Sequence, residues 1–410
     1  MSPSLPQLPK LNHPDEAIQR LVGLLRPIAT EKIAHQDVFD RVLAASLVAD
    51  RPSPPLDVSA MDGFALRISD IQPGKITVSG VSQAGHRAPQ MPTGCAVRIF
   101  TGAPVPSEAD LVIKREDTIE LTESFELRIP KDQLRVGQNI RRCGENGKQG
   151  DVILDSGTLV STSAMVAVAS FGARQIDAYR RLRVTIANTG DELVEPGEPS
   201  EPWQIRDSNG PLLEALLCPN RWLKIVERIR LQDREESVRQ YLTEALKQSD
   251  AILLTGGVSM GDTDHVPHVL RSIGCEIVFH KLPIRPGKPV LGAIGPQGQA
   301  ILGLPGNPVS VAATAIRIAL PVLRYLAGFR HIESKSSPVL LFNPDGKSIP
   351  LHWYRPVQCL QEQKDGSLVV QLTPNQGSGD IVALSRSDGF IEIAADQLTS
   401  PGPWKCYWLK

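Results

Sequence analysis

The segment AILLTGGVSMGDTDHVPHVLRS, residues 251–272, indicates how this chain folds. Its first four residues are apolar, as in a buried strand, and residues 266–272 have the apolar spacing of a helix. The turn between them, TGGVSMGDTDHV (255–266), is rich in glycine. Such a turn invites an anion, because free backbone N–H groups and the helix N-terminus point at it. This turn, however, also carries two carboxylates, Asp262 and Asp264, which would repel an anion.

The same alternation of strand and helix extends through residues 181–326. Strands are expected at 184–187, 223–226, 251–254 and 300–304, and helices at 211–217, 235–247, 266–272 and 309–326. Strands that alternate with helical patterns are typical of βαβ units. We therefore predict a doubly wound, mostly parallel α/β domain.

The flanking segments have different patterns. Residues 15–25 and 37–49 are predicted to be helical, and the prolines of RPSPPLD (51–57) end the second segment. From 58 to about 160 short β-branched runs at 76–78, 96–99 and 111–113 predict a β-rich domain, followed by a helix at 162–171. After about residue 337, short strands and turns predict a small β domain.

Composition excludes several classes of function. The chain has 410 residues, of which 41% are apolar and 22% charged, and its net charge is −1. Without a basic field, nucleic acid and anionic membranes are not expected partners. The six cysteines form no CxxC pair, and no run approaches the roughly 18 apolar residues of a membrane helix. The start, MSPSLPQLPKLNHPDEA, lacks the apolar core of a signal peptide, so we expect a cytoplasmic protein.

Three turns follow strands of the predicted α/β domain: TGDE (189–192), TGG (255–257) and PGNP (305–308). Ligands of open α/β sheets bind at this edge, so all three turns could face one pocket. Their spacing fits neither GxGxxG nor a Walker loop. Structural roles are also open: Asn307 and Pro308 suit a helix N-cap and first turn, and TGDEL could be a turn with helix-start acids.

Other polar stretches also have two interpretations. The segment KLPIRPGKP (281–289) sets three cations between prolines, which suits an oxyanion, although a solvated loop would look the same. SAMDGFAL (59–66) contains an Asp-Gly pair typical of a hairpin turn. His265 and His268 stand at i and i+3, but no third metal ligand is near them in sequence. No GxSxG nucleophile motif occurs.

Together these motifs resemble the molybdopterin molybdotransferase family, the bacterial MoeA type, which is related to the E domain of gephyrin. The matching stretches occur in the family's order: SPPLDVSAMDGFALR (53–67), TGAPVPSEADLVIKRED (101–117), RRCGENGKQGDVIL (141–154), NTGDEL (188–193), TGGVSMGDTDHV (255–266), RPGKPV (285–290), GLPGNPVSV (303–311), NQGSGD (375–380) and RSDGF (386–390).

The resemblance implies four domains: a discontinuous helical domain (1–50 and 140–178), an inserted β-rich domain (51–139), the α/β molybdopterin-binding domain (179–330) and a C-terminal β domain (331–410). It implies an elongated homodimer with sites built partly across the dimer. It also implies a reaction in which adenylylated molybdopterin and molybdate, with Mg²⁺, give molybdenum cofactor and AMP. The upstream adenylylating enzyme and molybdoenzyme acceptors would be partners.

The family's functional residues fall on definite positions of this sequence. Those implied to be catalytic are Asp62, Glu192, Asp233 and Asp264. Those implied to bind metal are Asp262, Asp264 and Glu192. Those implied to bind substrate are Thr101, Arg141, Gly256, Gly257, Ser259, Lys281, Arg285, Lys288, Pro305, Arg355 and Ser378. The chain departs from the family at Arg285, where lysine is common, and at Asn146, where aspartate is common.

The resemblance also explains the acidic turn. A carboxylate about 5 Å from a phosphate repels it by roughly 3 kcal/mol at an effective dielectric constant near 20. Mg²⁺ held by carboxylates and phosphate oxygens would remove this repulsion. Two other functions are considered: a non-catalytic, dimeric E-domain-like scaffold, and the upstream adenylylating step. Retention of the acids opposes the scaffold, and the flanking β domains oppose the upstream step.

Overall fold

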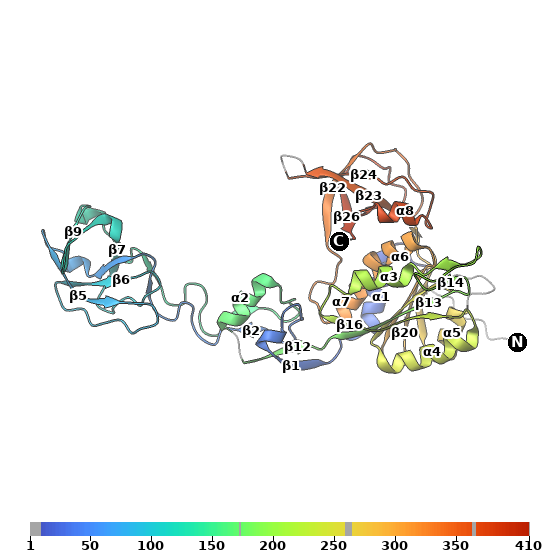
Figure 1. Ribbon diagram of the computed structural model, residues 1–410, viewed down its shortest axis with the longest axis horizontal. Helices are drawn as coiled ribbons and strands as arrows, with labels where there is room; N and C mark the ends of the chain where they lie inside the picture. Colours follow the sequence, from blue (N-terminus) through green and yellow to red (C-terminus); the bar gives the residue numbers. More distant parts are fainter. Residues whose placement is uncertain (1–9, 172–173, 259–264, 363–365, 410) are drawn as a thin grey trace. The chain divides into compact units, whose positions relative to one another are not determined.

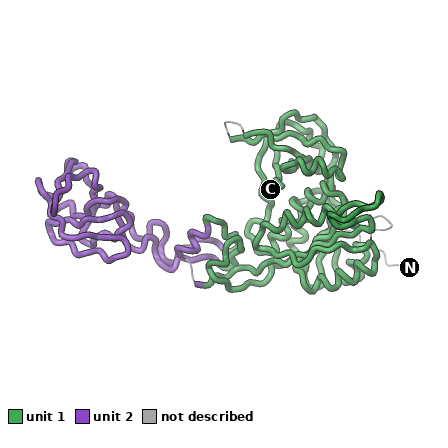
Figure 2. Tube along the Cα trace, viewed as in Figure 1, with its two compact units in different colours: residues 1–45, 156–163, 175–410 green, residues 46–155, 164–174 purple. Residues whose placement is uncertain are grey.

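The chain divides into two compact units. The computed structural model describes residues 10–171, 174–258, 265–362 and 366–409. Unit 1 comprises residues 1–45, 156–163 and 175–410, and unit 2 comprises residues 46–155 and 164–174 (Figure 2). Each unit is therefore assembled from segments that are separated in the sequence.

A mixed sheet with the order β16–β13–β17–β21–β20–β18 forms the centre of unit 1 (Figure 1). The neighbours β16 (Leu223–Leu231), β13 (Leu182–Thr189), β17 (Ala251–Thr255) and β21 (Ala300–Leu304) are parallel. Strand β20 (Leu291–Ile294) runs antiparallel to both β21 and β18 (Glu276–His280). The prediction of a mostly parallel sheet is confirmed, whereas the sequence patterns did not reveal β18 and β20.

Successive side chains of a strand point to opposite faces of the sheet, and in the central sheet both faces are buried by helices. Ala251 and Leu253 pack with residues of α1 (Pro14–Leu24), α3 (Asn209–Leu217), α6 (Pro308–Thr314) and α7 (Leu320–Leu326). Ile252 and Leu254 pack with residues of α4 (Glu235–Gln248) and α5 (Val266–Ser272) on the other face. Helices on both faces confirm the doubly wound architecture.

The predicted helix at 309–326 is one helical segment in three parts. A π-helical turn, η5 (Ala315–Ala319), joins α6 to α7. Residues 308–326 are long and apolar enough to cross a membrane, but 83% of the apolar window is buried inside the protein. This burial is expected for a core helix that packs against the central sheet.

A closed β-barrel forms the C-terminal part of unit 1. Its strands pair in the ring β23–β24–β22–β26–β25–β23. Their bounds are β22 (Ser336–Phe342), β23 (His352–Glu362), β24 (Leu368–Leu372), β25 (Gly389–Ile393) and β26 (Trp404–Trp408). Alternate residues such as Val339 and Leu341, and Ile391 and Ile393, fill the interior. Outside the ring, β19 (Ile284–Arg285) pairs in parallel with β23, and α8 (Ile381–Ser385) follows β24.

The expected helix at 37–49 is wrong. The structure has a short 3-10 turn, η1 (His35–Asp37), and then Asp40 in the left-handed region with φ 58°. Leu43 N donates to Thr158 O and pairs in a bridge with Ala178. The apolar spacing that imitates a helix thus serves pairing with distant segments. Nearby, β1 (Thr30–Ala34) pairs antiparallel with β12 (Gln175–Tyr179). Elsewhere in unit 1, β14 (Leu193–Val194) pairs in parallel with β15 (Ile205–Arg206).

Unit 2 contains a sheet with the order β7–β4–β6–β5–β9–β8. The bounds are β4 (Gly63–Leu66), β5 (Ile76–Ser82), β6 (Cys95–Ile99), β7 (Leu111–Lys114), β8 (Thr118–Glu120) and β9 (Ser124–Leu127). Phe64 stacks on Phe125 with ring centroids 4.1 Å apart. Short ladders join β2 (Leu47–Val48) to β11 (Val152–Leu154) and β3 (Val58–Ser59) to β10 (Ile140–Arg141). Helix α2 (Thr162–Phe171) has the expected bounds, and short 3-10 turns lie at 68–70, 115–117 and 131–133.

The Asp62–Gly63 pair is not a hairpin turn. It lies between β3 and β4, which pair with β10 and with β6 and β7 rather than with each other. A Cβ on Gly63 would lie 1.9 Å from the carbonyl oxygen of Ile113. Glycine is therefore needed here for the close approach of β4 to β7.

Candidate functional site

The turns after β13, β17 and β21 pack against one another at the carboxyl edge of the central sheet. A Cβ on Gly256 would lie 2.3 Å from the backbone oxygen of Thr189, and the φ of Gly256 is +80°. A Cβ on Gly306 would lie 3.9 Å from the Cα of Gly256. The three turns that the sequence placed at one edge therefore lie together, and glycine at position 256 allows the contact.

Carboxylates gather at the same edge. Asp233 N donates to Asp191 Oδ1 at 3.1 Å, which joins the end of β16 to the turn after β13. A Cβ on Gly190 would lie 2.7 Å from Glu192 Oε2, and one on Gly257 would lie 3.6 Å from Asp233 Oδ1. Asp233 thus lies beside the glycine turn at Gly257, and the carboxylate of Glu192 lies against Gly190 in its own turn. Ser259, Asp262 and Asp264 lie outside the described residues.

A buried polar network supports these turns. Thr255 Oγ1 donates to Asn188 Oδ1 at 2.8 Å, and Asn188 Nδ2 donates to Asp207 Oδ2 at 2.7 Å. Asp207 Oδ1 accepts from the backbone N–H groups of Asn209 and Gly210, both at 3.0 Å, at the start of α3. Sequence reasoning missed this network, and the helix-start position of Asp207 was the signal for part of it.

The PGNP turn holds a segment of the C-terminal barrel region. Asn209 Nδ2 donates to Gly306 O at 2.6 Å, and Asn307 Nδ2 donates to Ser378 Oγ at 2.9 Å. Val309 N donates to Ser378 O at 3.1 Å. Asn307 is the N-cap of α6 with proline next, but its side chain makes no capping bond. Asn307 and Pro308 therefore do occupy the N-cap and the first turn of α6, as one interpretation of the sequence expected. The side chain of Asn307, however, bonds to Ser378 instead of capping the helix.

A cavity of about 900 Å³ collects the substrate-binding residues expected in unit 1. Its lining includes Arg285, Lys288, Pro305, Arg355 and Ser378. The parallel pairing of β19 with β23 brings the basic segment beside the barrel. Among the described residues that line the cavity, Lys347 adds a cation that the sequence did not reveal. Lys281 is exposed and is not among the described lining residues.

Arg355 is held in a fixed orientation. Its Nη1 and Nη2 donate to the two oxygens of Asp345 at 2.7 and 2.9 Å, and Nη1 also donates to Thr399 Oγ1 at 3.3 Å. The guanidinium lies 4.2 Å from the ring centroid of Trp353, whose ring is also 5.9 Å from Arg285. Hydrogen bonds from Arg355 lower the pKa of Asp345. Asp345 and Trp353 were not foreseen, because their proximity depends on barrel closure.

Three further predicted site residues, Asp62, Thr101 and Arg141, lie within unit 2. Thr101 donates to Asp62 Oδ1 from its backbone N at 2.7 Å and from its hydroxyl at 2.8 Å. These two bonds lower the pKa of Asp62. Arg141 donates to Glu145 Oε1 at 2.5 Å and to Asn146 Oδ1 at 2.9 Å. Asn146, one of the two departures, therefore keeps an acceptor for Arg141 although it lacks the carboxylate charge.

Known proteins match these features along the chain. Three family models match: the MoeA N-terminal region (domain I and II) at residues 13–172, a probable molybdopterin binding domain at 185–325 and the MoeA C-terminal region (domain IV) at 353–403. A Haemophilus influenzae protein named molybdopterin molybdenumtransferase is 34% identical, over 93% of this chain and 94% of its own length. The chain belongs to the MoeA family.

Other relatives agree with membership of the MoeA family. A Synechococcus elongatus protein with the same name is 37% identical over 72% of this chain and 75% of its own length. The crystal structure of the molybdopterin biosynthesis moeA protein from Pyrococcus horikoshii OT3 matches with a TM-score of 0.81 and 25% identity, covering 97% of this chain and 100% of that chain. The multidomain α/β fold is thus that of the MoeA family.

Proposed function

We propose that this chain is a molybdopterin molybdenumtransferase, a transferase of molybdenum cofactor biosynthesis. It inserts molybdate into adenylylated molybdopterin and releases AMP. The observation that carries the proposal is the convergence of Arg285, Lys288 and Arg355 on one cavity, with the glycine turn and acids at the sheet edge of the same unit. The names of the relatives supply the reaction.

The cavity suits a tetrahedral oxyanion. Arg285 and Lys288 are exposed side chains on a segment stiffened by prolines, and Arg355 is oriented by Asp345 and Trp353. Fixed cations lose little conformational entropy when they bind an oxyanion. Ser378, positioned by Asn307, offers a hydroxyl donor in the same cavity. Molybdate is therefore assigned to these residues, and Gly256 and Gly257 leave room for the pyrophosphate link.

The acids at the sheet edge fit Mg²⁺, which prefers oxygen ligands. Glu192, with Asp262 and Asp264 from the turn, would hold it, and Asp233 is assigned a catalytic role. When bound, Mg²⁺ would neutralise phosphate oxygens and polarise the bond that is cleaved. Asp62, Thr101 and Arg141 of unit 2 are assigned to substrate as well. The same proposal keeps the four-domain division, the homodimer, the cytoplasmic location, and the upstream adenylylating enzyme and molybdoenzyme acceptors as partners.

One assay tests the proposal. The pure protein is incubated with adenylylated molybdopterin, molybdate and Mg²⁺, and both AMP release and reconstitution of an apo-molybdoenzyme are measured. We expect both signals to depend on molybdate. If the folded protein binds adenylylated molybdopterin but releases no AMP, the proposal is overturned and the non-catalytic, E-domain-like scaffold is favoured.

A further inference from the structure

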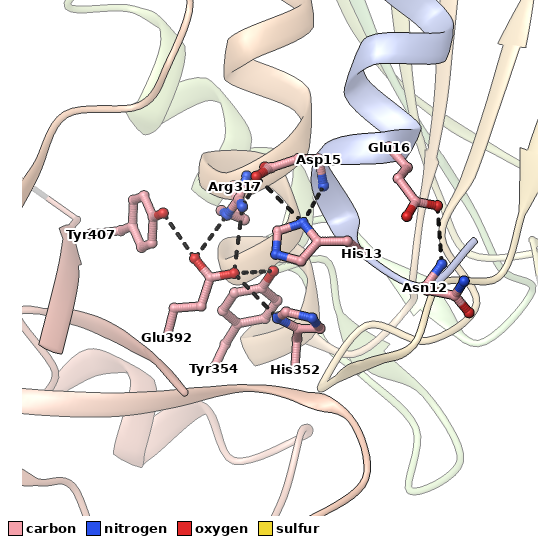
Figure 3. A network of polar contacts seen from close by, with 9 residues as sticks. All are labelled: Asn12, His13, Asp15, Glu16, Arg317, His352, Tyr354, Glu392 and Tyr407. Atoms are coloured by element: carbon pink, nitrogen blue, oxygen red, sulfur yellow. Dashed lines mark hydrogen bonds and ion pairs between the residues drawn. The ribbon is translucent and has the colours of Figure 1, made fainter. Parts of the chain in front are cut away.

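Three side chains far apart in the sequence meet in unit 1, and none of them is assigned to substrate. His13 precedes α1, His352 begins β23 and Glu392 lies on β25 (Figure 3). One potential ligand atom from each residue lies within 4.8 Å of the others. The two imidazole rings are in edge contact, with centroids 4.4 Å apart. Two imidazoles and one carboxylate are a ligand set typical of zinc.

His352 carries an unused buried nitrogen. The residue is 6% exposed, and its Nδ1 has no hydrogen-bond partner among the described residues. This nitrogen lies 3.7 Å from Glu392 Oε1. That distance is too long for a hydrogen bond. Two ligands of a tetrahedral zinc ion with bonds of 2.0–2.1 Å are about 3.4 Å apart, so the pair is close to the separation that a shared cation requires.

The carboxylate of Glu392 is oriented from one side. Its Oε2 accepts from Arg317 Nε at 3.0 Å and from the hydroxyl of Tyr407 at 2.9 Å. Its Oε1 has longer contacts, 3.4 Å to the hydroxyl of Tyr354 and 3.4 Å to Arg317 Nη2. Oε1 is therefore the oxygen with the greater capacity for a further partner. Hydrogen bonds to the other oxygen are the usual outer support of a ligating carboxylate.

His13 also has an outer partner. Its Nδ1 accepts from Asp15 N at 3.1 Å, and the same nitrogen is 3.4 Å from Asp15 Oδ2. With the proton on Nδ1, the imidazole would donate to the Asp15 carboxylate and present Nε2 to a cation. A ligating histidine commonly has such a carboxylate on its second nitrogen. Moving the ring proton from Nε2 to Nδ1 gives up the bond from Asp15 N but needs no change of fold.

The space at the site can hold a cation. Asp15 and Glu392 contribute two negative charges, and Arg317 and Lys405 two positive charges, so the cavity lining is neutral overall when both histidines are neutral, and the carboxylate of Glu392 supplies the negative charge next to the two imidazoles. A cavity of about 320 Å³ is lined by all three candidate ligands. It provides room for the ion and for a water molecule as a fourth ligand.

We propose that His13, His352 and Glu392 form a binding site for a divalent transition cation of the zinc type. The bound ion would tie the start of α1 to the C-terminal barrel. The site is separate in chemistry from the proposed Mg²⁺ site, because Mg²⁺ prefers an all-oxygen ligand set. The argument for this site does not rest on the proposed transferase activity.

The test uses Zn²⁺ and Co²⁺ as probes on the full chain. Protein stripped with a chelator is titrated with Zn²⁺ against a chromophoric competitor, and Co²⁺ absorption reports the ligand geometry. We expect one tightly bound ion per chain and a tetrahedral Co²⁺ spectrum. His13→Asn keeps an acceptor that can cap α1 but removes the imidazole, so affinity should fall by at least about tenfold and the Co²⁺ bands should be lost.

Two more variants keep the test decisive. His86→Asn removes an exposed histidine of unit 2 and should bind Zn²⁺ like the parent protein. His352→Gln removes the second imidazole and should lose affinity as His13→Asn does. Absence of stoichiometric Zn²⁺ binding by the parent protein would overturn the proposal. Equal binding by the parent and folded His13→Asn protein would also overturn it, since the ion would then bind elsewhere.

Discussion

Arg355 shows how a single residue is prepared for an anion. A guanidinium has five N–H donors in a rigid plane. Asp345 and Thr399 engage Nη1 and Nη2, and Trp353 supports the plane from one face. No partner of the Nε–H is present among the described residues, so one edge of the plane can still donate. Arg285 has no such clamp and shares only the ring of Trp353.

We predict that Arg285→Ala weakens molybdate use more than pterin binding. A charge-assisted hydrogen bond contributes about 1.5–3 kcal/mol, so the half-saturating molybdate concentration should rise roughly ten- to hundredfold. Arg285→Lys keeps the charge and should stay within a few fold of the parent protein. AMP release measured against molybdate concentration checks both variants. Lys335→Ala removes an exposed cation of unit 1 that lies outside the described cavity lining and has no assigned role, so it is the control and should change little. Equal loss of molybdate use and pterin binding in Arg285→Ala would point to a collapsed loop instead.

At the scale of elements, the sequence predicted those helices and strands whose bounds depend on neighbouring residues. The bounds of β21 and α5 follow directly from short apolar runs and their polar or glycine flanks. The expected helix at 37–49 was wrong because the backbone of Leu43 pairs with segments more distant in the chain. The motifs located the Arg285 and Ser378 segments, but not Trp353 or Asp345. The last two reach the cavity through the pairing of β19 with β23 and through barrel closure, which no local pattern encodes.

The glycine turn gives a prediction about packing between elements. Gly256→Ala places a Cβ 2.3 Å from the Thr189 oxygen in a left-handed conformation with φ +80°. Gly298→Ala has a similar φ of +85° but open space around the added carbon. The control should cost about 1 kcal/mol of unfolding free energy, and Gly256→Ala clearly more, because backbone must move. Thermal unfolding of both variants measures the difference, and equal shifts would show that the turns do not pack as described.

A second prediction concerns the connection of β13 to β17. Asp250 accepts from Arg180 at 2.6 and 2.7 Å and from the backbone of Arg183 at 2.8 Å. Burial raises the pKa of Asp250, but the hydrogen bonds from Arg180 and Arg183 outweigh it and lower the pKa. Because the pKa of Asp250 is lower in the folded than in the unfolded protein, the ionised carboxylate stabilises the fold. This stability is present above the pKa in the unfolded protein, about 3.9, and is lost as the pH falls through the lower pKa of the folded protein.

Asp250→Asn should therefore reduce the unfolding free energy at neutral pH by roughly 1–3 kcal/mol. The difference from the parent protein should stay constant down to about pH 5 and shrink below about pH 4. Unfolding by urea at a series of pH values measures it. Asp177→Asn is the matched control, because its pair with Lys32 is 3.9 Å long and exposed. That control should have almost no effect at any pH. A constant difference for Asp250→Asn down to pH 3 would contradict the ionic mechanism.

At the scale of the whole molecule, the chain leaves unit 1, forms unit 2 and returns. The residues assigned to substrate are distributed over both units: Asp62, Thr101 and Arg141 belong to unit 2, and Arg285, Lys288 and Arg355 to unit 1. Motif order in the sequence could assign these residues to a reaction. It could not decide whether the unit 1 residues and the unit 2 residues of one active site come from a single chain or from two. That depends on how the chains assemble and not on a local sequence pattern.

The family resemblance implies a homodimer whose sites draw on both chains, and mixing two variants tests this. Asp62→Asn alters unit 2 and Arg355→Ala alters unit 1, so each homodimer should be inactive. Co-expression in equal amounts gives heterodimers as about half of the dimers. If each site joins unit 2 of one chain to unit 1 of the other, one site of every heterodimer carries both substitutions and the other carries none. AMP release should then recover to about a quarter of the parent rate. Sedimentation at the 44.6 kDa of a single chain, or no recovery in mixed dimers isolated by two tags, would show that each chain builds its site alone.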